Sequence, residues 1–324
     1  MNAPTVAVCA AVLGLGSLSV ARADSEGCAS AAGLQSVTVH SGGVDRTVSV
    51  YFPRPSSPKQ LAPLIIDLHG SGSNGESHAG TSGFRALADK RGIIVASPDG
   101  AVVLDAQKRA FAWNIPGVPL VTGAMPAPDT PDDVQFIDDL IHALVSAHCA
   151  DARRVYATGM SGGGRMTSLL GCRLSTKLAA IAPVAGLRAG LPSAQDPAMP
   201  DADSCKPERS LPVLSFHGTG DLTNPFAGGG PRYWGYSVET ALARWAELDG
   251  CEPPVKRSQV SAFVTRLRYG RCRDHAEVVL YVTDRPDRDG GGHIWPGVGE
   301  SLQASEIILK FFRKHTLTSA TRSN

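Results

Sequence analysis

The chain has 324 residues, including 35 glycines and 23 prolines, and its 31 basic and 30 acidic side chains give a formal charge of +1. A folded chain of this length buries roughly three quarters of the surface that the unfolded chain exposes, without stabilisation by metals or disulfides. The balanced charge, with no run of one sign, argues against nucleic acid or an anionic membrane surface as the partner.

The first 23 residues have the pattern of an export signal. Val6 to Val20 is an apolar run, and Ala21-Arg22-Ala23 has the small-x-small spacing of a cleavage site, although no Lys or Arg precedes the run. A short buried helix is the alternative. No other segment is apolar enough to span a membrane. We therefore expect a secreted protein, extracellular or periplasmic, with residues 24–324 as a single domain and no membrane anchor.

Buried strands alternate with helices along the rest of the chain. Alternating or continuous apolar runs predict strands, and apolar residues at helical spacing predict helices. The expected strands are 37–40, 47–51, 64–68, 93–97, 155–158, 180–184, 212–216 and 278–283, and the expected helices are 83–91, one beginning at Asp132, one after residue 161, 237–248 and 300–314. This order predicts an α/β fold with a mainly parallel sheet and helices on both faces. Loops as long as the one from Asp99 to Pro131 are usually either functional or disordered.

The cysteines point to disulfides rather than to a metal. Seven are present, and loss of Cys9 with the signal leaves six, an even number that permits 15 pairings in an exported protein. Cys251 and Cys272 close the shortest plausible loop, so we favour that pair. The spacings match no zinc pattern, and Asp284, Asp287 and Asp289 form only part of a calcium loop. We expect neither a metal nor a cofactor.

The pentapeptide Gly159-Met160-Ser161-Gly162-Gly163 lies between an expected strand and an expected helix. In that context a G-x-S-x-G pattern predicts a nucleophile elbow, a strained turn that needs small neighbours. A glycine-rich turn without chemistry is the alternative. We predict that Ser161 is a nucleophile.

A serine nucleophile needs a base and an acid, which follow it in that fold in the order acid, then histidine. Asp221 and His293 follow later strands and fit that order. Loop acids (Asp196, Asp201 and Asp203) are alternatives to Asp221. The remaining downstream or helical histidines are expected to be structural or surface residues: His142, His148, His217, His275 and His315.

Two backbone N–H groups are expected to stabilise the oxyanion. The first belongs to Gly162, directly after the nucleophile, and the second to Ser71, in the loop after the strand that ends at Leu68. We expect His69 to fix that loop rather than to act in catalysis.

The chain resembles the polyhydroxybutyrate depolymerase and feruloyl esterase family of secreted α/β-hydrolases, close to carbohydrate esterase family 1. The resemblance rests on motifs that stand in the family's order: Leu68-His-Gly70, Trp113-Asn114, Asp132–Asp138, Gly159–Gly164, Ala182–Gly186, His217–Asp221 and Gly292–Gly297. It implies an α/β-hydrolase fold and places Ser161, Asp221 and His293 at the catalytic positions. It also places Trp295 and Trp113 beside the substrate cleft, with core packing as the alternative for both.

These patterns predict a secreted serine esterase that acts through an acyl-enzyme on a small-molecule or polymer-linked ester. Polymer-degrading members of the family commonly carry an extra substrate-binding domain, whereas this chain ends soon after its last expected helix. A soluble or plant-wall ester is therefore favoured over insoluble polyester. Polyester hydrolysis and acyl transfer use the same triad and remain alternatives, and a non-catalytic hydrolase-like binding protein is the alternative from another class.

Overall fold

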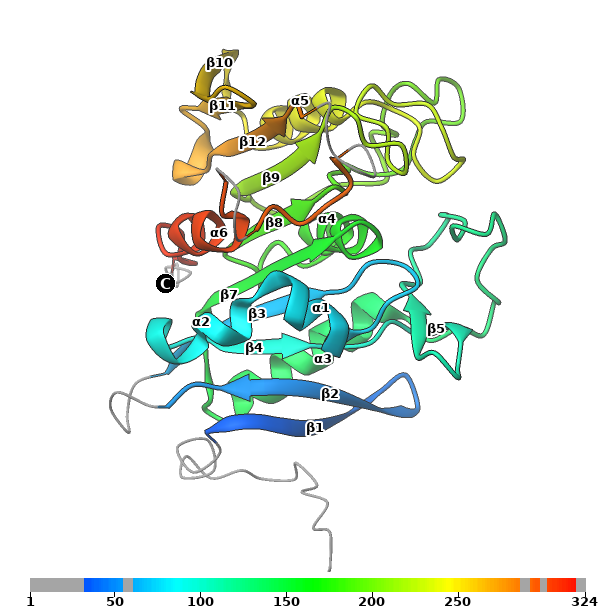
Figure 1. Ribbon diagram of the computed structural model, residues 1–324, viewed down its shortest axis with the longest axis vertical. Helices are drawn as coiled ribbons and strands as arrows, with labels where there is room; N and C mark the ends of the chain where they lie inside the picture. The colour runs from blue at the N-terminus through cyan, green and yellow to red at the C-terminus, as the bar shows by residue number, and fades with distance from the viewer. Residues whose placement is uncertain (1–31, 55–60, 286–291, 298–301, 319–324) are drawn as a thin grey trace, which may run out of the picture.

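A twisted ten-stranded sheet forms the centre of the computed structural model, which describes residues 32–54, 61–285, 292–297 and 302–318 (Figure 1). Its strand order is β1-β2-β4-β3-β7-β8-β9-β12-β11-β10. The strands are β1 (Gly33–Ser41), β2 (Val44–Phe52), β3 (Ala62–Leu68), β4 (Ile94–Ser97), β7 (Ala150–Met160), β8 (Ala180–Val184), β9 (Val213–Gly218), β10 (Glu252–Ser261), β11 (Val264–Gly270) and β12 (Val278–Thr283). A separate hairpin pairs β5 (Val102–Asp105) with β6 (Ala110–Ala112).

The middle of the sheet is parallel and its two sides are antiparallel. Neighbouring strands from β4 to β12 run in one direction, in the order β4-β3-β7-β8-β9-β12. The hairpin β1–β2 and the hairpin β10–β11 extend the sheet at its two sides. The carboxyl ends of the parallel strands therefore meet at one edge, which is where sites form in open α/β sheets.

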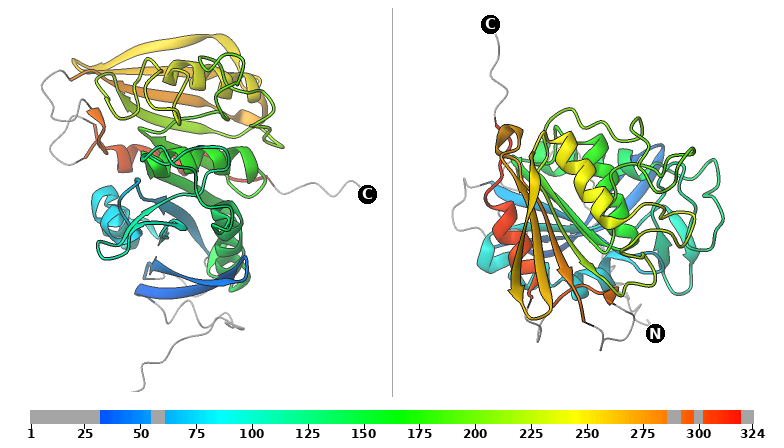
Figure 2. Two further views of the ribbon diagram at one scale, coloured as in Figure 1. Left: turned by 90° about the vertical axis from the view of Figure 1, so that its right-hand side faces the viewer. Right: turned by 90° about the horizontal axis from the view of Figure 1, so that it is seen from above.

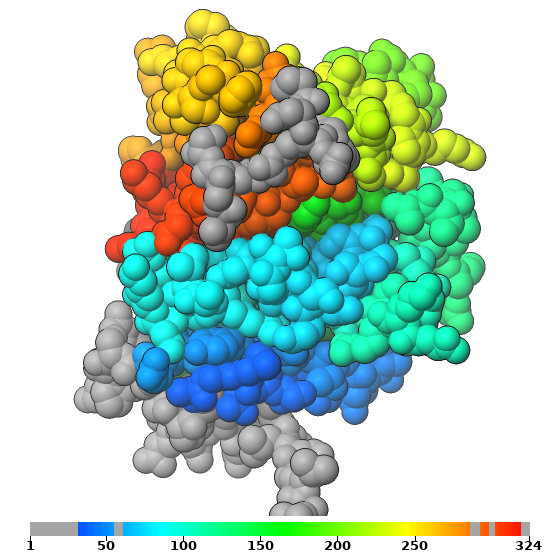
Figure 3. Space-filling model, in the orientation of Figure 1, coloured from blue at the N-terminus to red at the C-terminus, as the bar shows by residue number. Residues whose placement is uncertain are grey.

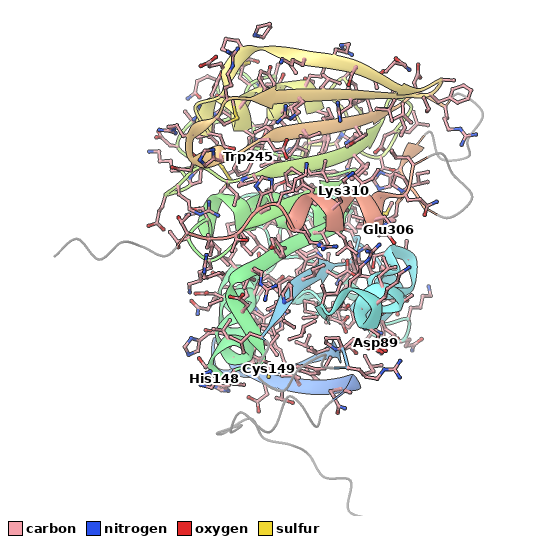
Figure 4. The ribbon with its side chains drawn as sticks, turned by 90° about the vertical axis from the view of Figure 1, so that its left-hand side faces the viewer. Asp89, His148, Cys149, Trp245, Glu306 and Lys310 are labelled. Carbon is pink, nitrogen blue, oxygen red and sulfur yellow. A yellow bond between two sulfur atoms is a disulfide. The ribbon has the colours of Figure 1, made fainter. Side chains whose placement is uncertain are left out.

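Helices cover both faces of this sheet (Figure 2). They are α1 (Gly75–Ser82), α2 (Phe84–Arg91), α3 (Asp133–Ser146), α4 (Gly162–Arg173), α5 (Val238–Leu248) and α6 (Ala304–Phe312), with a short 3-10 helix at Arg273–His275. The residues that α3, α4 and α5 bury belong to one core cluster, and those of α2 and α6 belong to a second. On that second face Arg91 of α2 pairs with Glu306 of α6 at 2.6 Å, and Figure 4 labels Glu306 beside Lys310 on α6. The predicted α/β architecture is confirmed.

Caps explain where the predicted helices begin. Asp132 precedes α3 and accepts hydrogen bonds from the N–H groups of Val134 and Gln135, while Ser237 caps α5 through Thr240. The sequence analysis missed α1, because GESHAGTS has no apolar periodicity; Asn74 caps it by accepting from Ser77. The last helix begins at Ala304, later than the predicted residue 300, and residues 298–301 lie outside the described part.

Two disulfides are described. The favoured pair Cys251–Cys272 is confirmed, and it joins the ends of the β10–β11 hairpin. Cys172, in the last turn of α4, is joined to Cys205 in the loop after β8. Cys149 is also disulfide-bonded, whereas Cys28 and the predicted export signal lie outside the described residues. Within the described ranges no helix is long and apolar enough to cross a membrane.

Asp249, directly after α5, is a buried carboxylate with a predictable effect on stability. Its Oδ1 accepts the Leu211 N–H at 2.8 Å, and its Oδ2 is buried without a hydrogen bond in the described residues. Burial raises the pKa of Asp249 to about 7. The protonated form is therefore favoured by folding, and this contribution is present below pH 4 and is lost as the pH rises through 7.

We expect Asp249→Asn, which keeps the acceptor for Leu211, to stabilise the fold more at pH 8 than at pH 5, by on the order of 2 kcal/mol. Thermal unfolding at both pH values measures this difference. The control is Asp203→Asn, at an exposed carboxylate that pairs with Lys206. An equal effect of Asp249→Asn at the two pH values would contradict the prediction.

Candidate active site

Ser161 occupies a sharp turn between β7 and α4. β7 ends at Met160, α4 begins at Gly162, and Ser161 has φ 57° and ψ −114°. A positive φ is a strained conformation for a residue with a side chain, and such strain concentrates at functional sites. The turn also packs against the end of β3, because a Cβ on Gly163 would lie 2.1 Å from the Leu68 carbonyl oxygen. Only glycine fits there, so the glycines of the motif permit the turn that presents Ser161.

The turn lies where the carboxyl ends of the parallel strands meet. The Ser161 N–H donates to the carbonyl of Val184 at the end of β8, and the Ala185 N–H donates to Phe216 in β9. Figure 2, left, looks onto this edge of the sheet, and Figure 3 shows residues 101–131 and 186–237 as two adjoining lobes beside it. Long loops therefore lie beside the edge of the sheet at which β7 and β8 end.

Asp221 and His293 reach the same edge from β9 and β12. Asp221 lies three residues after the end of β9, and Gly218 and Gly292 have their backbones in close contact. The Nδ1–H of His293 donates to Asp221 Oδ2 at 2.7 Å. The carboxylate side chain is fully buried, whereas the imidazole is 16% exposed. The structure thus joins the acid and the histidine that the sequence analysis selected, with the other ring nitrogen left for another group.

Several donors hold the Asp221 carboxylate in its charged form. Burial alone would raise its pKa, but hydrogen bonds from His217, His293 and the Asn224 N–H together hold the pKa of Asp221 well below its usual range. The Thr223 N–H donates to the same Oδ1 as Asn224, in a turn that the sequence analysis did not identify. An anion fixed in this way orients an imidazole and stabilises its protonated form.

His217 has the structural role expected for it. Its Nε2 lies 2.8 Å from the Asn224 carbonyl oxygen and 3.2 Å from Asp221 Oδ2. The ring is buried against Phe226 and Trp234. The other candidate acids lie apart from His293: Asp196 and Asp201 accept from backbone N–H groups of their own loop, and Asp203 pairs with Lys206.

The two predicted oxyanion donors lie beside each other. A Cβ built on Gly162 would lie 2.9 Å from the Ser71 nitrogen, and one on Gly70 would lie 3.5 Å from the Ser161 Cβ. The first N–H groups of α4 have no acceptor within the helix. Two N–H groups next to the candidate nucleophile match the arrangement that stabilises a developing oxyanion.

His69 and Trp113 fix the turn that carries Ser71. His69 is buried, its Nδ1 donates to the Gly70 carbonyl at 2.8 Å, and its Nε2 accepts from the Gly100 N–H at 2.9 Å. Burial lowers the pKa of His69 to about 4, which keeps the ring neutral. The Trp113 indole N–H donates to the His69 carbonyl at 2.7 Å, and the ring is only 3% exposed. Trp113 therefore packs in the core and supports the loop through His69, which agrees with the packing alternative.

Trp295 is also a packing residue in this structure. It is 7% exposed, its indole N–H donates to Ser305 Oγ, and Phe84 and His78 pack against its ring edge to face. The burial of both tryptophans favours core packing over the substrate contact that the family resemblance implies. The reason is the same for each ring: the indole N–H is already bonded within the protein.

A second group of serine, histidine and aspartate lies beneath Trp295. Ser82 Oγ donates to Asp67 Oδ2 at 2.6 Å, and His78 Nε2 lies 3.0 Å from Asp67 Oδ1. All three are at most 4% exposed, and the serine proton goes to the carboxylate rather than to the imidazole. This trio lacks both access and a base for the serine, so it is a structural network.

The described residues hold no group of three or more His, Cys, Asp or Glu side chains that could bind a metal ion. Of the partial calcium pattern, Asp284 accepts from Thr219 Oγ1, and Asp287 and Asp289 lie outside the described ranges.

With Ser161 in its turn after β7 and the Asp221–His293 pair at the carboxyl edge of the sheet, the fold has the architecture of the α/β-hydrolases. The acetyl xylan esterase from Aspergillus awamori has a similar solved structure, with a TM-score of 0.61 at 16% identity, over 86% of this chain and 98% of that one. Likeness at this identity shows the fold.

The chain belongs to the family described as esterase PHB depolymerase, whose model matches residues 47–221. It is 34% identical to feruloyl esterase B of Piromyces equi over 277 residues, covering 82% of this chain and 45% of that protein. It is also 34% identical to the putative esterase NocK of Nocardia uniformis, covering 72% and 66% of the two chains, and 26% identical to a probable feruloyl esterase C of Aspergillus clavatus, covering 95% and 98%. The chain thus spans less than two thirds of the first two relatives.

Proposed function

We propose that this protein is a secreted serine esterase of the feruloyl esterase and polyhydroxybutyrate depolymerase type. The observation that carries the proposal is the 2.7 Å hydrogen bond from His293 to the buried Asp221, at the sheet edge where Ser161 sits in its strained turn. Disulfides in the described residues support secretion, because such bonds persist in oxidising compartments. Residues 1–23 would be the export signal and residues 24–324 the single catalytic domain.

The mechanism assigns one role to each group. Ser161 Oγ attacks the ester carbonyl and gives its proton to His293 Nε2, while Asp221 holds the Nδ1–H and stabilises the imidazolium. The N–H groups of Gly162 and Ser71 stabilise the oxyanion. His293 then protonates the departing alcohol, which leaves an acyl-enzyme on Ser161. Water, deprotonated by His293, attacks the acyl carbon and releases the acid and free Ser161.

The names of the relatives suggest the substrate class. Feruloyl and acetyl xylan esterases are named among proteins similar to this chain, so we propose a soluble or plant-wall ester as the substrate, with polyester as the second candidate. Acyl transfer uses the same acyl-enzyme and differs only in the acceptor that enters.

Covalent trapping tests the proposed mechanism. A fluorophosphonate probe is expected to add once per molecule, on Ser161, and a competing ester should slow the labelling. Methyl ferulate, a p-nitrophenyl acetate series and polyhydroxybutyrate then rank the substrates by kcat/KM. Labelling at another residue, or none together with no ester cleavage, would refute the proposal.

A further inference from the structure

A cavity of about 60 Å³ lies beside α4. One wall is a face of α4 with helical spacing (Arg165, Ser168, Leu169, Cys172 and Arg173). The other walls come from Ile115, Pro116, Val118, Arg188, residues 190–192, Ser204 and Tyr233. Because one water molecule needs about 10–15 Å³ of such space, the cavity has room for several water molecules. Of the residues that the structure describes, no Asp or Glu lines it.

Arg165 is a buried cation in this cavity with little to neutralise it. It is 6% exposed and lies one helical turn after Ser161. Its Nη2 lies 3.5 Å from Ser71 Oγ, its guanidinium packs 4.2 Å from the centre of the Tyr233 ring, and its Nε has no hydrogen bond in the described residues. Burial lowers the pKa of Arg165 to about 10, so the group keeps its charge at neutral pH.

Arg188 is a second buried cation in this cavity, and unlike Arg165 it donates hydrogen bonds to backbone carbonyls. Its Nη1 donates to the carbonyls of Trp234 and Tyr236, its Nε donates to its own neighbour Leu187, and both aromatic rings face its guanidinium. These contacts hold Arg188 within the protein, while its Nη2 is buried without a hydrogen bond in the described residues. Within the ranges that the structure describes, no carboxylate acts on the charge of Arg165 or Arg188. Proteins seldom bury charges without a partner, because desolvation is costly.

We propose that this cavity is a subsite for a carboxylate carried by the ester substrate, and that Arg165 binds it. The inference rests on the proposed serine esterase mechanism. Arg165 follows Ser161 by one turn and reaches towards Ser71, whose N–H is a proposed oxyanion donor. A substrate acylating Ser161 would therefore reach Arg165 with a carboxylate a few bonds from the ester. The apolar side chains of Ile115, Leu169 and Leu191 would contact the intervening carbons.

Matched esters test the proposal on the wild-type protein and locate the carboxylate. Monomethyl glutarate and methyl 5-methylhexanoate differ only in having a carboxylate or an isopropyl group on the acyl side. 3-Acetoxybutanoate and 4-methylpentan-2-yl acetate make the same comparison on the alcohol side. We expect the charged member of one pair to have a kcat/KM about 10- to 100-fold higher, which is the size of one hydrogen bond to a charged group. Equal values, or a preference for the neutral member in both pairs, would overturn the proposal.

Variants of Arg165 distinguish a role in binding the substrate from a role in stabilising the fold. Arg165→Met should abolish the preference by lowering kcat/KM for the charged ester, mainly through KM, and Arg165→Lys should retain part of it. Arg244→Met, at a surface residue of α5 that pairs with Glu247, removes the same charge elsewhere and should leave the preference unchanged. An equal loss on charged and neutral esters in Arg165→Met would show a structural role and overturn the assignment.

The wild-type comparison decides the question if Arg165→Met does not fold. Cleavage of neutral esters without any preference for a carboxylate would leave the proposed function intact and refute the subsite alone. If no ester in either pair or in the p-nitrophenyl series is cleaved, the proposed function fails and the subsite fails with it.

Discussion

Ser161→Ala is expected to lower kcat for ester hydrolysis by on the order of a millionfold, to the level left by substrate binding and the oxyanion donors. The change removes the oxygen that is proposed to form the acyl-enzyme, and it leaves the Asp221–His293 hydrogen bond in place. The substitution also keeps the hydrogen bond from the Ser161 N–H to the Val184 carbonyl, because that bond belongs to the backbone. Initial rates with p-nitrophenyl acetate, normalised to folded protein, measure the effect.

The second serine–histidine–aspartate trio offers a matched control. Ser82→Ala removes the buried Oγ that donates to Asp67, so it should lower the melting temperature while leaving turnover per folded molecule close to that of the wild type. The reverse pattern, with activity lost in Ser82→Ala and kept in Ser161→Ala, would move the reaction to the buried trio and show that the assignment to the elbow is wrong.

Asp221→Asn is expected to lower kcat by about 10⁴-fold with little change in the fold, as the same change does in a serine protease. The physical reason is the tautomer of His293. An amide NH₂ facing Nδ1 would make Nδ1 the acceptor and leave the proton on Nε2, which then has no lone pair to receive the proton of Ser161. The Asn oxygen still accepts from the N–H groups of Thr223 and Asn224, so the turn is kept.

The kinetic signature separates this effect from a general loss of structure. Fluorophosphonate labelling of Asp221→Asn should slow in parallel with kcat, while KM for a neutral ester stays near the wild-type value. Asp201→Asn is the matched control, because Asp201 was one of the three alternative acids and its Oδ1 accepts the N–H of Asp203 within its own loop. A loss of activity in Asp201→Asn comparable to that in Asp221→Asn would contradict the assignment.

The fold was predictable because its signals are local. Each parallel strand is a short apolar run, as at 64–68 and 180–184, and each helix after it has an apolar face or a capping residue such as Asp132 or Ser237. The candidate site was predicted on the same basis, because the carboxyl ends of the parallel strands meet at one edge of the sheet. The α1 helix was missed because its stability comes from the Asn74 cap and from packing, which leave no apolar period in its sequence.

Burial of single side chains could not be predicted in this way. An arginine in the first turn of a helix looks solvent-exposed in a sequence, and only the packing of Tyr233 and Ser71 around it shows that Arg165 is enclosed. For the same reason Trp113 and Trp295 looked available to a ligand. Their indole N–H groups bond to His69 and Ser305, partners that are distant along the chain. Such contacts depend on tertiary structure and have no local signature.

The Cys172–Cys205 bond joins the far end of α4 to the loop that forms the opposite wall of the arginine-lined cavity. That loop departs from β8 and carries none of the proposed triad. Insertions or substitutions within it can therefore reshape substrate selection while the strands that hold Ser161, Asp221 and His293 stay unchanged. Under the proposed mechanism this loop contributes to substrate selection without contributing to the triad, and such a loop is one way in which a single hydrolase scaffold can diversify across many esters.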